Sequence, residues 1–122
     1  MNKGKTEPKM SMLLLDVAGD FIAMGKGIEE KQEYLNCAAS SWNMACLTEN
    51  EQKRAIKKYI KAYRKLNPSF TKADLKHEEE NIRLLIKKKI ELYPDVNKQI
   101  ATVTIKKING QNHITVASIR EK

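Results

Sequence analysis

Basic residues are concentrated in one short segment of the sequence. Four of them recur at i, i+4, i+7 and i+11 and would form one continuous stripe on a helix: Arg54, Lys58, Lys61 and Lys65. Three more flank this stripe: Lys53, Lys57 and Arg64. A helix of this kind, over about 53–65, can follow a phosphate backbone, with an affinity that comes largely from released counterions. The other interpretation is a solvated helix face, because most of these residues are Lys, a strongly hydrated point charge.

A metal or acid–base site has few candidate residues. The sequence has two histidines, His77 and His113, and the spacing Asp74-x-x-His77 places two ligand types on one helical face. This spacing is similar to half of a di-iron bundle motif, but the second half and its further carboxylates are absent. We therefore predict no metal ligand, and keep an enzyme or metal site around His77 as the weakest alternative.

Nucleophilic catalysis is not favoured either. Cys37 and Cys46 are nine residues apart, which puts them on opposite faces of one expected helix, so they cannot pair with each other. They do not have the Cys-x-x-Cys spacing of zinc or redox sites, and free thiols suit a reducing compartment. The sequence also contains no G-x-S-x-G, P-loop, G-x-G-x-x-G or H-E-x-x-H pattern. We predict no catalytic residue, no cofactor and a protein that is not an enzyme.

Apolar residues at helical spacing predict the elements that would position these side chains. Four helices are expected, over about 11–24, 29–47, 49–66 and 72–93. Thr48 and Glu51 match a capping box at the start of the third helix, and Thr71 opens the fourth. The third carries an apolar face: Ile56, Tyr59, Ile60, Tyr63 and Leu66. In the fourth, the apolar stripe runs through Leu75, Ile82, Leu85, Ile86, Ile90 and Tyr93, and a basic run, Lys87 to Lys89, comes late, as the helix dipole favours.

The end of the sequence changes from helical spacing to alternation. Two strands are expected, over about 99–108 and 111–120, joined by Asn109-Gly110, the dipeptide preferred in a type I′ turn. A two-residue loop pairs Ile105 with Ile114, and Val103 with Val116, so that four branched side chains share one face.

Together these patterns predict a mainly helical α+β fold: a cluster of about four helices followed by a C-terminal two-stranded antiparallel hairpin. One domain is expected over 11–122, after a disordered tail over 1–10 whose composition does not favour a core. No segment has the length of apolar sequence that a membrane span or a secretory signal needs, so we expect a cytoplasmic protein without a membrane partner.

For function, the sequence favours a small non-enzymatic interaction module that associates with itself or with another protein. The surfaces that suggest self-association are the wide apolar face of the helix over 29–47 and the edge of the hairpin. Nucleic-acid binding through the basic helix is the first alternative. Asn36 and Asn43, one heptad apart, either fix packing by buried hydrogen bonds or face solvent.

Overall fold

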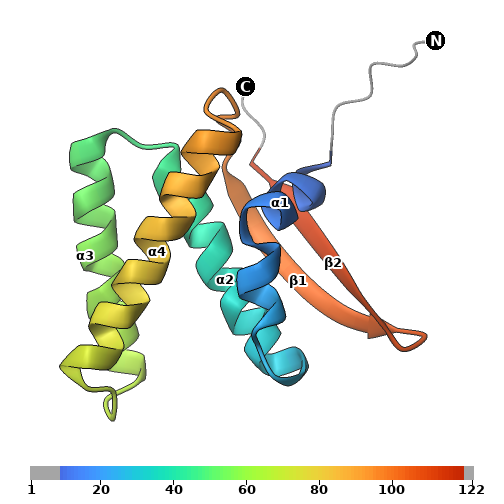
Figure 1. The fold of residues 1–122 in the computed structure, drawn as a ribbon, viewed down its shortest axis with the longest axis horizontal. Coiled ribbons are helices and arrows are strands. Elements are labelled where there is room, and N and C mark those ends of the chain that lie inside the picture. Colours follow the sequence, from blue (N-terminus) through green and yellow to red (C-terminus); the bar gives the residue numbers. More distant parts are fainter. Residues whose placement is uncertain (1–8, 120–122) are drawn as a thin grey trace.

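The computed structural model describes residues 9–119, and it confirms the predicted α+β fold. Four helices precede one antiparallel hairpin (Figure 1). The elements are α1 (Met10–Ala23), α2 (Gly27–Ala45), α3 (Glu49–Leu66), α4 (Lys72–Leu92), β1 (Ile100–Ile108) and β2 (Gln111–Ser118). The tail expected over 1–10 falls on residues outside the described part of the chain, except that Lys9 is the N-cap of α1 and Met10 its first residue.

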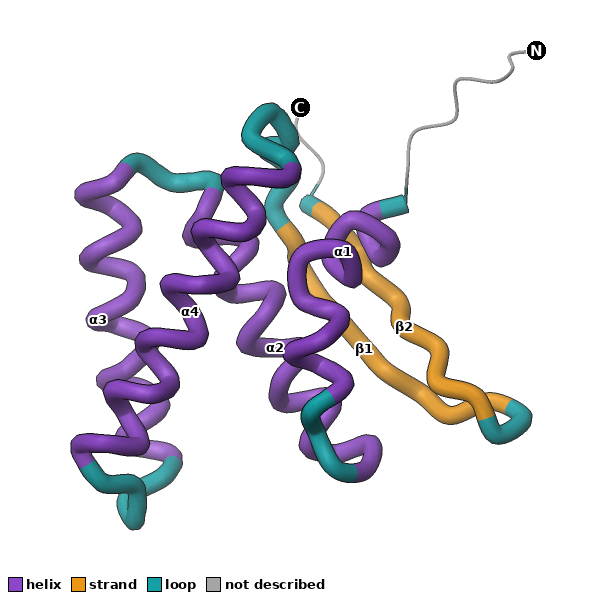
Figure 2. Tube along the Cα trace, in the orientation of Figure 1, coloured by secondary structure: helices purple, strands orange, loops and turns teal. Residues whose placement is uncertain are grey.

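Helix α2 lies at the centre of the fold. It packs against α1, α3, α4 and β1, whereas within 9–119 the only elements in contact with α3 are α2 and α4. The hairpin lies at the other end of the molecule from α3, and its turn extends away from the helices (Figure 2). Because four other elements pack around α2, its apolar face is buried within the fold. The buried apolar residues of this face are Leu35, Cys37, Ala38, Ala39, Trp42, Met44 and Ala45.

Local signals explain where the helices begin. The Thr48 side chain accepts from the backbone N–H of Glu51 while the Glu51 side chain accepts from the backbone N–H of Thr48, which confirms the capping box. Thr71 and Asp74 form a second one at the start of α4. Helix α2 begins two residues earlier than expected, at Gly27, which has a φ of +75° that glycine adopts without strain.

The hairpin has the predicted register. Ile105 lies opposite Ile114 and Val103 opposite Val116, and both turn residues, Asn109 and Gly110, have positive φ, as a type I′ turn requires. One extra residue on β1, Ala101, forms a bulge between Ile100 and Thr102.

Burial along the helices differs from the predicted stripes at three positions. Leu66 is 82% exposed at the end of α3, and Ile90 is 43% exposed, whereas Lys89 is only 1% exposed. Lys89 follows Leu85 by four residues and Ile86 by three, so its side chain lies on the buried face of α4 and Ile90 lies beside that face.

None of the helices within residues 9–119 has the length and apolar character that a membrane-spanning helix needs.

Candidate nucleic-acid interface

Most of the surface of helix α3 is exposed to solvent. The Thr48–Glu51 capping box fixes its start, and Ile56 is its only buried residue. Tyr59 and Ile60 are half-buried and pack against the core. The helix is therefore held along one narrow stripe, and the rest of its circumference faces outward.

Every basic side chain predicted for the interface is exposed on α3. We call this set the basic face: Lys53, Arg54, Lys57, Lys58, Lys61, Arg64 and Lys65. Within 9–119 the one salt bridge joins Arg83 to Glu79 on α4, so no member of the basic face is neutralised by an ion pair with the described residues. Its positive charge is available to an external anion.

The basic face borders a shallow hollow of 540 Å³, lined by Arg54, Lys57, Lys58 and Lys61, with Ala55 and Glu51. Glu51 is the one acidic side chain in this lining, and its carboxylate accepts the Thr48 N–H and hydroxyl. These hydrogen bonds lower the pKa of Glu51 below its usual value. Since this acid marks the first turn of α3, the basic face extends from there toward the C-terminal end of the helix.

The two tyrosines of α3 are engaged within the protein. The Tyr59 hydroxyl donates to Glu78 Oε2 at 3.3 Å, and its ring lies 6.0 Å from that of Tyr63, which also meets Phe70 at 5.4 Å. Burial raises the pKa of Tyr63 to about 12, and that of Tyr59 still further. These rings are therefore packing groups between α3 and the residues beside it, rather than platforms for nucleic-acid bases.

The other candidate residues are scattered. Cys37 is buried, and desolvation together with nearby Glu78 raises its pKa to about 12, which keeps the thiol protonated at neutral pH. His77 is exposed, and the Asp74 carboxylate accepts the backbone N–H of Thr71. In the part of the chain that the structure describes, no three His, Cys, Asp or Glu side chains form a group that could hold a metal ion.

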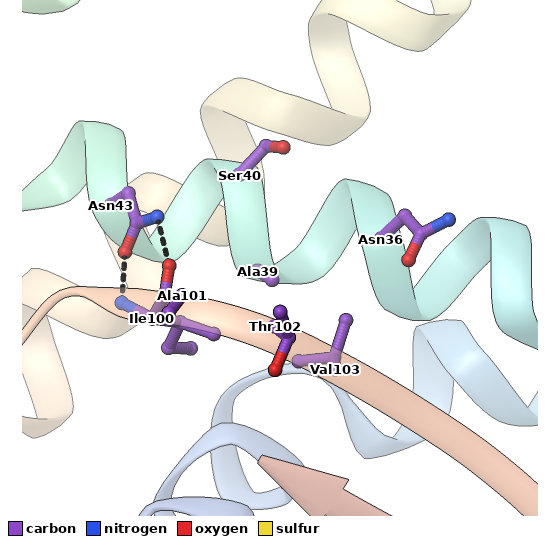
Figure 3. Close-up of a pocket in the computed structure, with 8 residues that line it drawn as sticks. All are labelled: Asn36, Ala39, Ser40, Asn43, Ile100, Ala101, Thr102 and Val103. Carbon is purple, nitrogen blue, oxygen red and sulfur yellow. Dashed lines mark hydrogen bonds between the residues drawn. The ribbon is translucent and has the colours of Figure 1, made fainter. Parts of the chain in front are cut away.

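A polar contact between α2 and β1 was only partly visible in the sequence. Asn43 accepts the N–H of Ile100 at 2.6 Å and donates to the Ile100 carbonyl at 2.9 Å (Figure 3). Gln32 accepts the N–H of Ile105 at 2.9 Å and donates to the Val103 carbonyl at 3.1 Å. We call Gln32 and Asn43 the amide clamp. Asn36, which the sequence singled out together with Asn43, is exposed and accepts from Gln32 instead.

A groove of 390 Å³ lies between α2 and β1. Asn43 of the amide clamp lines it, together with Asn36, Ala39, Ser40 and residues 100–103. Asn43 is turned toward Ile100 on one side of this groove, and Ala39 lies next to the strand, whereas Ser40 points away from it (Figure 3). Every buried side-chain nitrogen or oxygen atom of the described residues has a hydrogen-bond partner, so no unpaired buried polar group among them marks this groove as a ligand site.

Among the candidate residues, the described structure gathers the seven basic side chains on one exposed face of α3, whereas Cys37, Tyr59 and Tyr63 are engaged within the protein and His77 is exposed apart from them. No protein-family model matches the chain, and neither the curated proteins nor the solved structures include a match to it.

Proposed function

We propose that this protein is a non-enzymatic interaction module that binds nucleic acid through the basic face of α3. The observation that carries the proposal is the exposure of seven basic side chains on one helix without a salt bridge to any described residue. A solvated face that served only to keep the helix in water would need fewer positive charges, and both signs would be mixed along it. The excess of one sign is typical of a surface for a polyanion.

The dimensions of the basic face suit a phosphate backbone. From Arg54 to Lys65 the helix rises about 16 Å at 1.5 Å per residue. One strand of a duplex places a phosphate at about every 3.4 Å along its axis, so the stripe spans roughly five phosphates. The face offers mainly Lys, and its tyrosines pack inside the protein, so the interaction we propose is with the backbone and has little sequence preference.

Salt dependence tests this proposal directly. With about four phosphates neutralised, the logarithm of the binding constant falls with the logarithm of salt with a slope of about −3.6 for duplex DNA. A fourfold rise in salt should therefore weaken binding roughly 10²-fold. Fluorescence anisotropy with a labelled mixed-sequence duplex, repeated with a single strand, measures this slope.

A charge reversal with a matched control separates the basic face from net charge. The test variant carries Arg54→Glu, Lys58→Glu, Lys61→Glu and Lys65→Glu. The control carries the same number of reversals at exposed positions of α4: Lys72, Lys76, Lys87 and Lys88. The test variant should lose binding by tenfold or more beyond the control, on the order of 1 kcal/mol or more. Equal losses in the two variants, or no binding by the wild type at low salt, would reject the proposal.

A further inference from the structure

The two outer edges of the hairpin are not equivalent. The amide clamp occupies the outer edge of β1, because Gln32 binds Ile105 N–H and Val103 C=O. Those backbone groups therefore point away from β2, which makes Ile105 and Val103 members of non-hydrogen-bonded pairs. Their partners on β2, Ile114 and Val116, must also point their N–H and C=O groups outward, at the other edge of the hairpin.

Nothing in the described chain covers that second edge in the same way. Among the hydrogen bonds within 9–119, no helix side chain reaches the backbone of β2, although α1 packs against this strand. Natural edge strands are usually protected by a Lys, a Pro or a bulge. The sequence of β2, QNHITVAS, has no Lys, Arg, Asp, Glu or Pro, and the bulge of this hairpin lies in β1. Among residues 9–119, the outer edge of β2 therefore has neither a neighbouring strand nor a charged residue of its own to protect it.

A hollow lies beside β2. Its volume is 470 Å³, and it lies between the start of α1, at Lys9 to Ser11, and β2. Ile114, Thr115 and Val116 all line it. Ile114, Val116 and Ser118 share one face of β2, and Lys98 completes the lining, so the hollow lies mainly between this face and the start of α1.

We propose that the outer edge of β2 pairs with β2 of a second copy of this chain, antiparallel about a two-fold axis at Thr115. In this register Ile114 of each copy lies opposite Val116 of the other, and each such pair exchanges both backbone hydrogen bonds. Thr115 meets Thr115, a favourable cross-strand pair, and His113 meets Ala117, so no like charges are opposed. The result is a four-stranded sheet in place of a hairpin that is marginal by itself.

Charge placement favours a second copy as the occupant. The chain carries a formal net charge of +8, which would oppose association if the positive surfaces met. The basic face lies on α3, at the end of the molecule remote from β2 (Figure 1). Strand β2 itself has no Lys, Arg, Asp or Glu, although Lys9 and Lys98 line the hollow beside it. Pairing through β2 puts the two basic faces at opposite ends of the dimer, where salt screens their repulsion.

Disulfide trapping tests the register. At a non-hydrogen-bonded antiparallel pair the Cα atoms are about 4.5 Å apart, within the range of a disulfide. Thr115→Cys, in a chain with Cys46→Ser, should give a covalent dimer under mild oxidation. The matched control is Thr104→Cys, the exposed neighbour of Thr115 on β1. Its counterpart in the other copy would be three strands away, about 14 Å, which is too far for a disulfide.

Sedimentation equilibrium supplies an independent measurement without cross-linking. The wild type should show a concentration-dependent dimer, and Thr115→Lys should raise its dissociation constant by roughly fivefold, because two like charges then face each other. Thr104→Lys should leave the constant unchanged, and circular dichroism checks that both variants fold. A wild type that stays monomeric at its highest workable concentration, equal cross-linking of the two cysteine variants, or a dimer indifferent to Thr115→Lys would overturn the proposal.

Discussion

The ammonium group of Lys89 is held inside the protein by two contacts. Its Nζ donates to the Val96 carbonyl at 2.6 Å and lies 5.2 Å from the centre of the Trp42 ring. A buried charge is tolerated only where hydrogen bonds or an aromatic face replace its hydration. Lys89 thus ties the segment that follows α4 to the largest side chain of α2.

Two substitutions at this position separate packing from charge. Lys89→Met keeps an unbranched apolar side chain but loses the contacts of the ammonium group. Because it also removes the desolvation penalty of a buried charge, we expect the free energy of unfolding to fall by only about 1 kcal/mol. Lys89→Ala also leaves a cavity and should cost about 3 kcal/mol. Urea denaturation measures both. The exposed neighbour Lys88 is the control, with changes within about 0.5 kcal/mol for the same substitutions. Equal costs for Met and Ala at position 89 would contradict the packing argument.

The spacing of residues along α4 contained a signal for this burial. By spacing, Lys89 belongs to the buried stripe of Ile82, Leu85 and Ile86. Because Lys is charged and Ile is apolar, the sequence prediction placed Ile90 on the buried stripe and Lys89 on the exposed surface. Its two partners, Val96 and Trp42, come from a loop and another helix. A sequence pattern within one helix has no information about such partners, so the burial of a Lys could not be predicted with it.

At the scale of elements, the amide clamp depends on a match between two lengths, the spacing of its two side chains along α2 and the spacing of their backbone partners along β1. Gln32 and Asn43 are eleven residues apart, about three helical turns, so they share one face and lie about 16 Å apart along α2. Five strand residues, the separation of Ile100 and Ile105, also span about 16 Å. A primary amide carries one acceptor and a donor group, as a peptide unit does, so the two side chains act as a neighbouring strand.

Removing the clamp should destabilise the protein and expose particular amides. Asn43→Ala leaves both backbone groups of buried Ile100 without a partner and should cost about 2 kcal/mol. Hydrogen exchange should show lost protection at the Ile100 N–H in this variant and at the Ile105 N–H in Gln32→Ala. Asn36→Ala, on the same helix, is the control and should stay within about 0.5 kcal/mol of the wild type. Unchanged exchange at Ile100 would show that the clamp is not a source of stability.

Local rules predicted the elements and not their docking. Asn109-Gly110 set the hairpin register, and Thr48 with Glu51 set the start of α3, because these signals act within a few residues of chain. Asn43 lies 57 residues from Ile100, so its choice between solvent and a buried partner depends on how α2 meets β1. The basic face was predicted residue by residue because helical spacing alone determines which side chains share the outside of a peripheral helix.

At the scale of the whole molecule, the two proposed interactions use opposite ends. The basic face lies on α3, β2 lies beyond α1 and α2, and the core between them is shared by all the helices and the hairpin (Figure 1). A dimer through β2 would therefore display two basic faces that point apart, far enough to contact separate stretches of one nucleic acid. Binding of the second face would then be intramolecular, and its strength would depend on the length of the nucleic acid.

This arrangement predicts that dimerisation affects binding to long nucleic acids and leaves binding to short ones unchanged. The wild type should bind a long duplex more tightly than a short duplex that accommodates one basic face, by at least tenfold after correction for the number of sites, since linked sites gain by effective concentration. Thr115→Lys should reduce this difference at protein concentrations near the dimer dissociation constant, because it weakens the dimer, and should keep the affinity for the short duplex, because the added charge is remote from α3. Thr104→Lys adds the same charge on the same sheet face and should retain the length dependence. If Thr115→Lys keeps it as well, the two basic faces do not act together, and binding through α3 is a property of the single chain.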